Sequence, residues 1–291
     1  MLRMYRREKS IQIKSSASAL YNNLSVLPIA EKCLTYFTVV HCNVVNMVSA
    51  SGDGLNFSHR QLQSKEGSIA ASSSLIIQAS WCVLPSRVLL VLTSQKGIQM
   101  YESDGSIMVY WHALDIPETP SGTALSLGTG HPTVEYIADI VSADDSGLLC
   151  IWKAGEDFKL LNKIPAYGCS CSSVKLWCGI VIAGYGSGQI RLYDALSGMV
   201  HAEVNAHARW IYALDIAPDS GKLLSGAEDS LVRIWKLSKS PESHTVEVTF
   251  CCISCEHCYC YCTGCTRHVV GLHTRSRELA KGLMGYCLKT S

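Results

Sequence analysis

Residues 206–235 read AHARWIYALDIAPDSGKLLSGAEDSLVRIW, and this stretch decides the fold of the chain. Its apolar positions predict a first strand over 211–216 and a second over 223–226, with a Pro-Asp-Ser-Gly turn between them. Another turn follows at Asp229-Ser230, and a third strand ends at Trp235. The stretch therefore predicts consecutive antiparallel strands joined by tight turns.

The end of this stretch is repeated along the chain. A tight-turn signal, a short alternating strand and a closing aromatic residue occur at 145–152, 186–193 and 229–235. The aromatic residues Trp152, Tyr193 and Trp235 follow one another at intervals of 41 and 42 residues. A period of about 40–45 residues is typical of one four-stranded propeller blade. A single blade cannot cover both of its apolar faces, so such units must stack on one another.

Weaker units precede these three. Residues 88–94 and 96–101 predict a strand, a turn and a strand that ends in an aromatic residue. Residues 34–40 and 43–48 predict a hairpin of a first, divergent blade. We expect loops over 51–74, which is rich in Ser and Gly, and over 116–132, which contains Pro117, Pro120 and several glycines.

The repeats resemble the WD-repeat family. Gly130-His131 is the dipeptide that opens a repeat in that family, Ala206-His207 is a variant of it, and Tyr193-Asp194 corresponds to the closing dipeptide. The resemblance implies an all-β fold, a β-propeller, whose top face and blade edges bind peptides and proteins. It also implies a buried hydrogen-bonded tetrad within one blade, with its members at His207, Ser225, Asp229 and Trp235.

Other blades match the tetrad less well. The resemblance implies a looser copy at His131, Ser142, Asp145 and Trp152, whereas the unit over 183–194 has no Ser–Asp pair, so we expect packing to hold it. Trp235 is predicted to lie in the core, and Trp210, beside the opening turn, is predicted to be partly exposed. His207 and Asp229 could also be an acid–base pair, but in a blade we interpret them as buried structural partners.

Residues 5–115 and 131–248 resemble one member of the family more closely, with two departures. Tyr101 and Trp152 are 51 residues apart, which is more than one blade and less than two, so we predict that an internal blade is missing there. After Phe250 the sequence changes to a tail that contains eight of the fifteen cysteines. We therefore predict an incomplete or irregular propeller of about five blades over 1–248, and a poorly structured Cys-rich tail over 249–291.

The tail suggests an alternative function. Cys252, Cys255 and Cys258, followed by Cys262, Cys265 and His268, have the spacing of zinc ligands, and a structural zinc site needs four such groups. The cysteines are denser than in a zinc finger, and little apolar sequence surrounds them. A zinc-binding module is thus the alternative hypothesis, and the main interpretation assigns no metal and no cofactor to the chain.

Composition narrows the classes of function. The chain has 291 residues, 48% of them hydrophobic, and a formal net charge of +1, with no basic stripe of the kind that nucleic-acid binders carry. We therefore expect that the chain binds no nucleic acid. We find no apolar run long enough for a transmembrane segment and no secretory signal, so we expect a cytoplasmic protein. The glycines over 184–188 lead from one strand into another and predict a hairpin turn, since a phosphate-binding loop would open a helix.

No spacing supports a catalytic constellation, so we predict that the chain is not an enzyme. The main hypothesis is a non-catalytic scaffold that binds other proteins. A missing blade would leave apolar faces uncovered near Leu148 and Ile151 at one end and near Leu231 and Ile234 at the other. Two outcomes are open: the remaining blades close into a smaller ring, or the uncovered faces recruit other chains and the protein self-associates.

Overall fold

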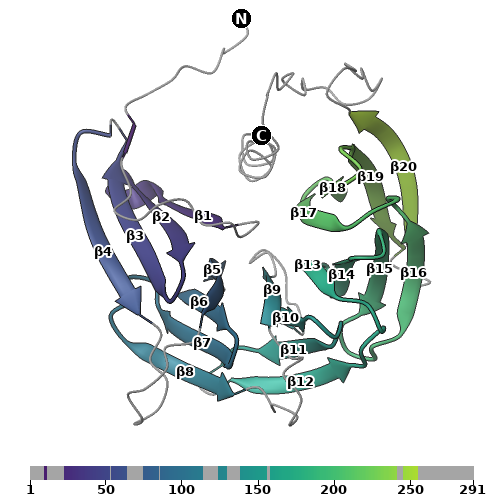
Figure 1. Cartoon of the computed structure of the whole chain (residues 1–291), viewed down its shortest axis with the longest axis horizontal. Coiled ribbons are helices and arrows are strands. Elements are labelled where there is room, and N and C mark those ends of the chain that lie inside the picture. Colours follow the sequence, from purple (N-terminus) through teal and green to yellow (C-terminus); the bar gives the residue numbers. More distant parts are fainter. Residues whose placement is uncertain are drawn as a thin grey trace, which may run out of the picture.

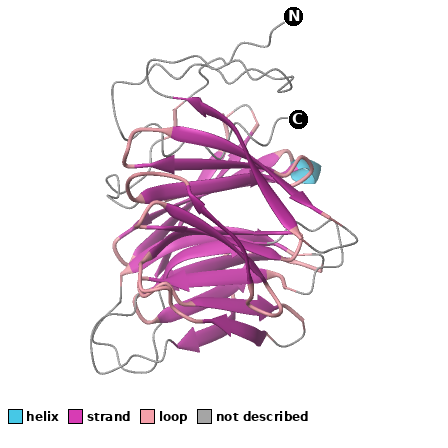
Figure 2. Cartoon of the chain, turned by 90° about the vertical axis from the view of Figure 1, so that its right-hand side faces the viewer, coloured by secondary structure: helices cyan, strands magenta, loops and turns pink. Residues whose placement is uncertain are grey.

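The computed structural model contains five four-stranded antiparallel sheets, and each sheet uses four strands that are consecutive in sequence. It describes residues 10–11, 23–52, 54–63, 75–84, 86–113, 124–129, 138–155, 158–240 and 245–254. The sheets stand side by side around an arc, as the blades of a propeller do (Figure 1). The side view shows that the described chain is almost entirely strand (Figure 2). One short 3-10 helix, Ala30–Lys32, is the exception in this part of the chain.

The five sheets have the following strands. The first contains β1 Leu24–Ile29, β2 Leu34–His41, β3 Val44–Ser51 and β4 Phe57–Gln63. The second contains β5 Ile76–Val83, β6 Val88–Ser94, β7 Gly97–Glu102 and β8 Met108–Ala113. The third contains β9 Ala124–Thr129, β10 Ile140–Asp144, β11 Leu149–Lys153 and β12 Lys159–Ile164. The fourth contains β13 Cys171–Trp177, β14 Ile180–Tyr185, β15 Gln189–Asp194 and β16 Val200–Asn205. The fifth contains β17 Ile211–Ala217, β18 Lys222–Ala227, β19 Val232–Lys239 and β20 Val246–Ser254.

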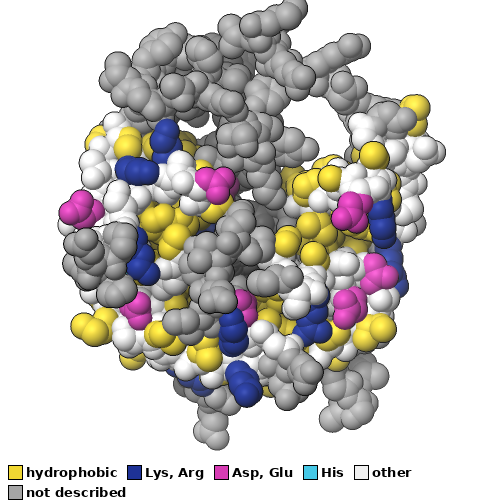
Figure 3. Space-filling view, turned by 180° about the vertical axis from the view of Figure 1, so that it is seen from behind, with side chains coloured by type: hydrophobic (Ala, Val, Ile, Leu, Met, Phe, Trp, Pro, Cys, Tyr) yellow, Lys and Arg dark blue, Asp and Glu magenta, His cyan; other side chains and the backbone are white. Residues whose placement is uncertain are grey.

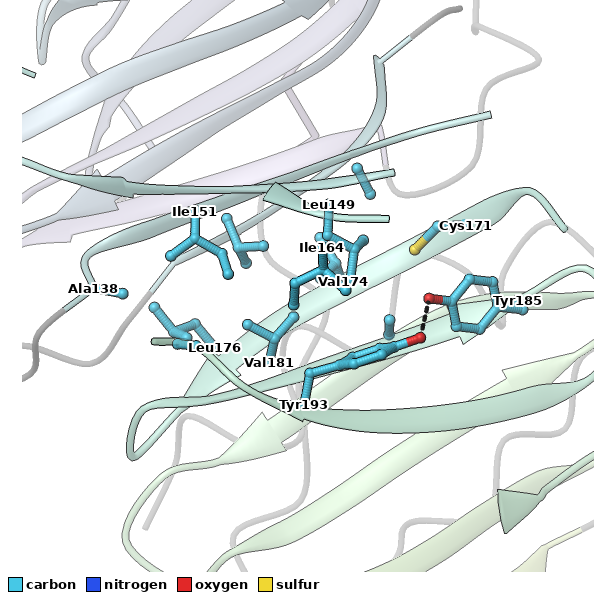
Figure 4. Packing of buried hydrophobic residues seen from close by; sticks show 14 residues of the cluster. Ala138, Leu149, Ile151, Ile164, Cys171, Val174, Leu176, Val181, Tyr185 and Tyr193 are labelled. Atoms are coloured by element: carbon cyan, nitrogen blue, oxygen red, sulfur yellow. Dashed lines mark hydrogen bonds between the residues drawn. The ribbon is translucent and has the colours of Figure 1, made fainter. Parts of the chain in front are cut away.

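Apolar clusters between neighbouring sheets hold the arc together. Side chains alternate between the two faces of a strand, so a buried strand sends apolar residues to both of its neighbours. In β14, for example, Val181 and Ala183 pack toward the third sheet, whereas Ile180 and Ile182 pack toward the fifth. Similar clusters join the first sheet to the second and the second to the third. Figure 4 shows the cluster between the third and fourth sheets.

The arc is open. The first and fifth sheets are its two ends, and Figure 1 shows them on opposite sides of the gap in the ring. This confirms the predicted all-β, incomplete propeller of about five blades. The position of the opening differs from the prediction, because the second and third sheets pack closely. Ile151, which was expected on an exposed face, is fully buried between the third and fourth sheets.

Two of the predicted loops contain strands. β4 lies within 51–74, where its polar sequence Phe-Ser-His-Arg-Gln-Leu-Gln belongs to the outer, solvent-facing strand of its sheet. Such a strand needs few apolar residues, so the alternation of apolar and polar residues that predicts a strand is weak. β9 lies within 116–132, where Leu125 and Leu127 alternate with small residues, but the following glycines favoured a loop. β9 gives the third sheet its fourth strand.

The predicted boundary at 248 falls inside β20, which runs on to Ser254. Val246, Val248 and Phe250 alternate along β20, and the strand pairs with the whole length of β19. The rest of the predicted tail, residues 255–291, lies outside the described residues, as does His131. In the described part of the chain, no helix is long and apolar enough to cross a membrane.

Candidate functional site

A chain of hydrogen bonds runs through the fifth sheet. The indole N–H of Trp235 donates to the Ser225 hydroxyl oxygen at 2.9 Å. The same hydroxyl lies 2.8 Å from Nε2 of His207, whose Nδ1 lies 3.0 Å from both carboxylate oxygens of Asp229. The structure thus brings together all four residues of the implied tetrad. With the His207 proton on Nδ1, Trp235 donates to Ser225, Ser225 to His207 and His207 to Asp229, so each member has a partner.

The local backbone places these groups. His207 lies on the loop that leads from β16 into β17, and its N–H donates to the Gly188 carbonyl at 2.8 Å. Gly188 has a φ of 85°, and a Cβ there would lie 2.1 Å from the His207 carbonyl oxygen. Only glycine allows this loop to approach the β14–β15 turn so closely. The glycine-rich segment over 184–188 is therefore a hairpin turn, as predicted.

The tetrad has the connectivity of a Ser-His-Asp catalytic triad, but its surroundings exclude that chemistry. Ser225 is 0% exposed, and the Trp235 indole occupies one lone pair of its oxygen. A nucleophilic serine needs space in front of its oxygen for a substrate carbonyl. The arrangement can satisfy buried polar groups and fix the register of β18 and β19, but it cannot attack a substrate.

Burial sets the protonation of the pair. Desolvation lowers the pKa of His207 below its ordinary value and outweighs the effect of the adjacent Asp229. Burial acts to raise the pKa of Asp229, but hydrogen bonds from His207 and from the backbone N–H groups of Leu231 and Ala208 prevail and lower it. The folded state therefore holds a neutral histidine and an ionised aspartate at neutral pH.

These shifts predict a pH-dependent stability. Because both pKa values are lower in the folded state, the unfolded chain binds more protons at acidic pH, and stability falls as the pH drops. The loss due to His207 begins as the pH falls below about 6.5, and the loss due to Asp229 follows below about 3.8. We expect His207→Asn to have a lower melting temperature at pH 8 and a flatter profile between pH 7 and 5. A wild-type melting temperature that does not change over that range would contradict this account.

In the third sheet, the described residues show part of such a tetrad, and the predicted His131 lies outside them. The Trp152 indole donates to the Ser142 hydroxyl at 3.2 Å, both side chains being buried. The carboxylate that organises the β10–β11 turn is that of Asp144, which accepts from the N–H groups of Ser146 and Leu148 at 2.9 Å each. The resemblance to the WD-repeat pattern had instead implied the neighbouring Asp145 as the aspartate of this tetrad.

The fourth sheet uses a different polar pair, which sequence reasoning missed. The hydroxyls of Tyr185 and Tyr193 lie 2.9 Å apart inside the cluster against the third sheet (Figure 4). The Arg191 guanidinium stacks on the Tyr167 ring, 3.1 Å from its centre, and forms an ion pair with Glu203. We expected this sheet to be held mainly by packing. The closing aromatic Tyr193 was recognised, but nothing in its spacing indicated that a second tyrosine would replace the Ser–Asp pair.

The loops beside the tetrad form the top surface, which we define by Tyr167, Ser187, Arg209, Trp210 and Glu228. Ser187, Arg209 and Glu228 are exposed, whereas Tyr167 and Trp210 are partly buried. A Cβ at Gly186 would lie 2.6 Å from the Trp210 ring, so this ring lies directly on the β14–β15 turn. The surface thus presents two charges of opposite sign around a fixed aromatic side chain, which is suited to a peptide or protein partner.

The buried cysteines, the possible metal ligands and the surface charges indicate no reactive or metal-binding site among the described residues. Burial raises the pKa of the thiols of Cys82 and Cys171, which keeps them protonated and unreactive. Within the residues that the structure describes, no cluster of His, Cys, Asp and Glu is arranged to hold a metal. On the face seen in Figure 3, basic side chains are scattered among acidic and apolar ones.

The fold and the tetrad define a WD-repeat β-propeller protein. The sequence model of the WDR54 family matches residues 4–130 and 128–273, and the chain belongs to this family. It is 49% identical to the WD repeat-containing protein 54 of Mus musculus over 302 residues, which cover 86% of this chain and 90% of that protein. Its identity to the Homo sapiens WD repeat-containing protein 54 is 45% over 312 residues, with 91% of each chain covered.

A solved structure supports the fold. In a crystal structure of an active polycomb repressive complex 2 in the basal state, one chain matches with a TM-score of 0.62 and 13% identity. The match covers 85% of this chain and 61% of that one. A likeness at this level of identity shows the propeller architecture alone.

The comparisons also bear on the missing blade. The alignment with the mouse protein is 302 positions long, but it includes only 86% of the 291 residues of this chain. The remaining positions are gaps in this chain, so the mouse protein contains residues that this chain lacks. The two segments of the family match meet at 128–130, at the end of β9. That position lies between Tyr101 and Trp152, where the interval of 51 residues predicts the loss. The second segment continues to residue 273, beyond the predicted propeller boundary at 248.

Proposed function

We propose that this protein is a non-catalytic scaffold in the cytoplasm that binds other proteins through the top surface of its propeller. The observation that carries the proposal is the buried Ser225. Among the residues that the structure describes, the arrangement with the connectivity of a catalytic triad is closed to substrates, whereas the loops above it present exposed side chains. Membership of a WD-repeat family and the propeller fold support the same function.

Charge reversal on the top surface tests the proposal. Arg209→Glu combined with Glu228→Lys changes two exposed side chains and leaves the net charge unaltered. Lys32→Glu combined with Glu247→Lys makes the same reversals of charge at exposed positions elsewhere and is the matched control. Each form would be expressed in cells at equal level, captured by affinity, and its co-purifying proteins quantified by mass spectrometry.

We expect the top-surface variant to lose at least fivefold in recovery of a set of proteins that the wild type and the control retain. Equal recovery by all three forms would show that this surface does not bind partners. The alternative zinc-binding module depends on Cys252, which lies in β20, and on residues 255–268, which lie outside the described part, and it stays a prediction.

A further inference from the structure

Two arginines occupy equivalent positions in neighbouring sheets. Arg191 lies on β15 and Arg233 lies on β19, each two residues before the closing aromatic residue, Tyr193 or Trp235. Those aromatic residues pack toward the preceding sheet, and side chains alternate along a strand, so both arginines face the preceding sheet as well. Arg233 therefore lies in the seam between the fourth and fifth sheets, where the outer strands β16 and β20 run side by side (Figure 1).

The loops beside the two arginines are equivalent too. The β14–β15 turn donates a backbone N–H to the carbonyl of Ser170, and Tyr167 lies three residues before Ser170. The β18–β19 turn donates a backbone N–H to the carbonyl of Trp210, and His207 lies three residues before Trp210. His207 thus takes the place of Tyr167. Burial lowers the pKa of His207 most, and the charge of Arg233 lowers it further, so the guanidinium lies near the imidazole.

Arg191 has the partners that a partly buried guanidinium needs. It stacks on the Tyr167 ring, and its Nη2 forms an ion pair with Glu203. Glu203 is the residue opposite Arg191 on β16, so the fourth sheet itself supplies the carboxylate. Hydrogen bonds between a guanidinium and a carboxylate are among the strong ones in proteins, because both groups are charged.

Arg233 has no such partner. It makes no hydrogen bond and no ion pair with the residues that the structure describes, although it is partly buried and its Nε is shielded from solvent. The Nε of Arg191 is shielded as well, but there Glu203 balances the charge. The residue opposite Arg233 on β20 is Ile253, which has no carboxylate. A guanidinium that loses water without gaining an acceptor is destabilising, and an anion beside it would restore the missing hydrogen bonds.

The surroundings of Arg233 favour a singly charged acid. A carboxylate oxygen of Asp229 lies 3.0 Å from Nδ1 of His207, and the exposed Glu228 precedes Asp229 in the chain. These two negative charges oppose a phosphate monoester, which carries about −1.5 to −2 charge at neutral pH, more than they oppose a carboxylate. A carboxylate is also the group that Arg191 binds in the fourth sheet.

An exposed aromatic side chain near Arg233 fits a protein ligand. Phe250 stands opposite Trp235 on β20, and the centres of the two rings are 5.2 Å apart, so Phe250 lies on the same side of the sheet as Arg233. Phe250 is 46% exposed. A free small acid would leave this apolar surface uncovered, whereas a polypeptide would cover it with the residues next to its acidic side chain.

We propose that this seam binds an aspartate or glutamate side chain of a partner protein, which pairs with Arg233 as Glu203 pairs with Arg191. The neighbouring residues of the partner rest on Phe250. The inference rests on the proposed scaffold function, and it names the chemistry of a contact beside the top surface, at residues that the top surface does not include.

Stability distinguishes a ligand site from an internal ion pair. Arg191→Met and Arg233→Met remove the same charge at equivalent positions. We expect Arg191→Met to lower the melting temperature, because it leaves Glu203 unpaired, and Arg233→Met to leave it unchanged or raise it, because no partner within the described chain is lost. A fall with Arg233→Met that matches the fall with Arg191→Met would show that Arg233 stabilises the fold, and would overturn the proposal.

Binding would be measured with peptides from a phage library of random twelve-residue sequences. The library would be selected on the full chain and cleared of phage that bind Arg233→Gln. Fluorescence anisotropy would then give the affinity of the selected peptides for the wild type and for Arg233→Gln. Arg191→Gln is the matched control, because it removes the equivalent arginine whose carboxylate partner lies within the chain.

We expect the enriched peptides to share one acidic residue. Their affinity should fall at least tenfold with Arg233→Gln, or when that acidic residue is replaced by its amide, and both changes together should cost little more than either alone. Arg191→Gln should leave the affinity unchanged. Failure to enrich any peptide, or an affinity that does not depend on the acidic residue, would overturn the proposal. Tighter binding of a peptide with phosphoserine at that position would overturn the choice of a carboxylate.

The top-surface variant separates this inference from the proposed function. Arg209→Glu combined with Glu228→Lys leaves Arg233 and Phe250 in place. Peptides that need Arg233, found together with co-purifying proteins that this variant retains, would support the seam and remove the top surface as the binding site. Loss of those proteins with the variant, found together with no peptide that needs Arg233, would support the proposed function and overturn the inference about the seam.

Discussion

Trp235→Ala is expected to lower the free energy of unfolding by about 3–5 kcal/mol, the range for loss of a large buried aromatic side chain. Trp235 is 5% exposed, lies in the cluster between the fourth and fifth sheets, and packs edge-on against Phe250 at 5.2 Å. The substitution also leaves Ser225 without the indole donor in a fully buried position. Chemical denaturation followed by circular dichroism would measure the change.

Two further variants separate the contributions. Trp235→Phe keeps an aromatic ring but removes the N–H and part of the indole, so its effect should include the 1–3 kcal/mol cost of an unsatisfied buried group and stay below that of Trp235→Ala. Trp210→Ala removes a ring that is partly buried on the β14–β15 turn and should destabilise the chain much less than Trp235→Ala. Equal losses for Trp210→Ala and Trp235→Ala would contradict the assignment of Trp235 to the core.

Much of the propeller could be predicted because its strongest signals are local. Turn residues at 186–188 and 229–230 mark the β14–β15 and β18–β19 turns, and the aromatic residues at 152 and 193 lie one residue before the ends of β11 and β15. The predicted strand end at Trp235 was wrong, because β19 continues to Lys239. The tetrad residues could be matched position by position, and their side chains do meet. These features depend on residues that are close together in the sequence, so they can be recognised in a single sequence.

The missed features depend on long-range packing. β4 is polar because it lies at an outer edge, and β9 has a sequence in which strand and turn signals compete, so neither stands out without its neighbours. The pairing of Tyr185 with Tyr193, and the stacking of Arg191 on Tyr167, join residues whose proximity follows only from the assembled sheets. The place of the opening was missed for the same reason, since only the structure shows that the second and third sheets pack together.

An open ring has a large consequence for association. The face of the first sheet that points away from the second contains Phe37 and Val39, which are partly buried, and Leu24 and Phe57, which are 44% and 49% exposed. At the other end, Leu224 and Ile234 share the face of the fifth sheet that points away from the fourth. Ile234, which was expected to be exposed on this face, is only 7% exposed, so the prediction was wrong for this residue. In a closed ring each of these faces would have a neighbouring blade.

Each large apolar side chain that is left uncovered forgoes roughly 1.5–3 kcal/mol of burial. A few such residues rival the 5–15 kcal/mol stability of a typical domain, and the exposed ones lie on the face of the first sheet. We therefore expect chains to associate through these end faces. Phe57→Asp, which places a charge on the face of the first sheet, should weaken the association, whereas Ile107→Asp, at a comparably exposed position on the second sheet, should not.

The most direct test of the open propeller is size-exclusion chromatography with light scattering over a range of protein concentrations, combined with binding of a hydrophobic fluorescent dye. The open five-bladed structure predicts a mass that rises with concentration, together with dye fluorescence that Phe57→Asp alters and Ile107→Asp does not. A monomer at every concentration that binds no dye and melts in one cooperative transition would show that the ring closes, and would contradict this account.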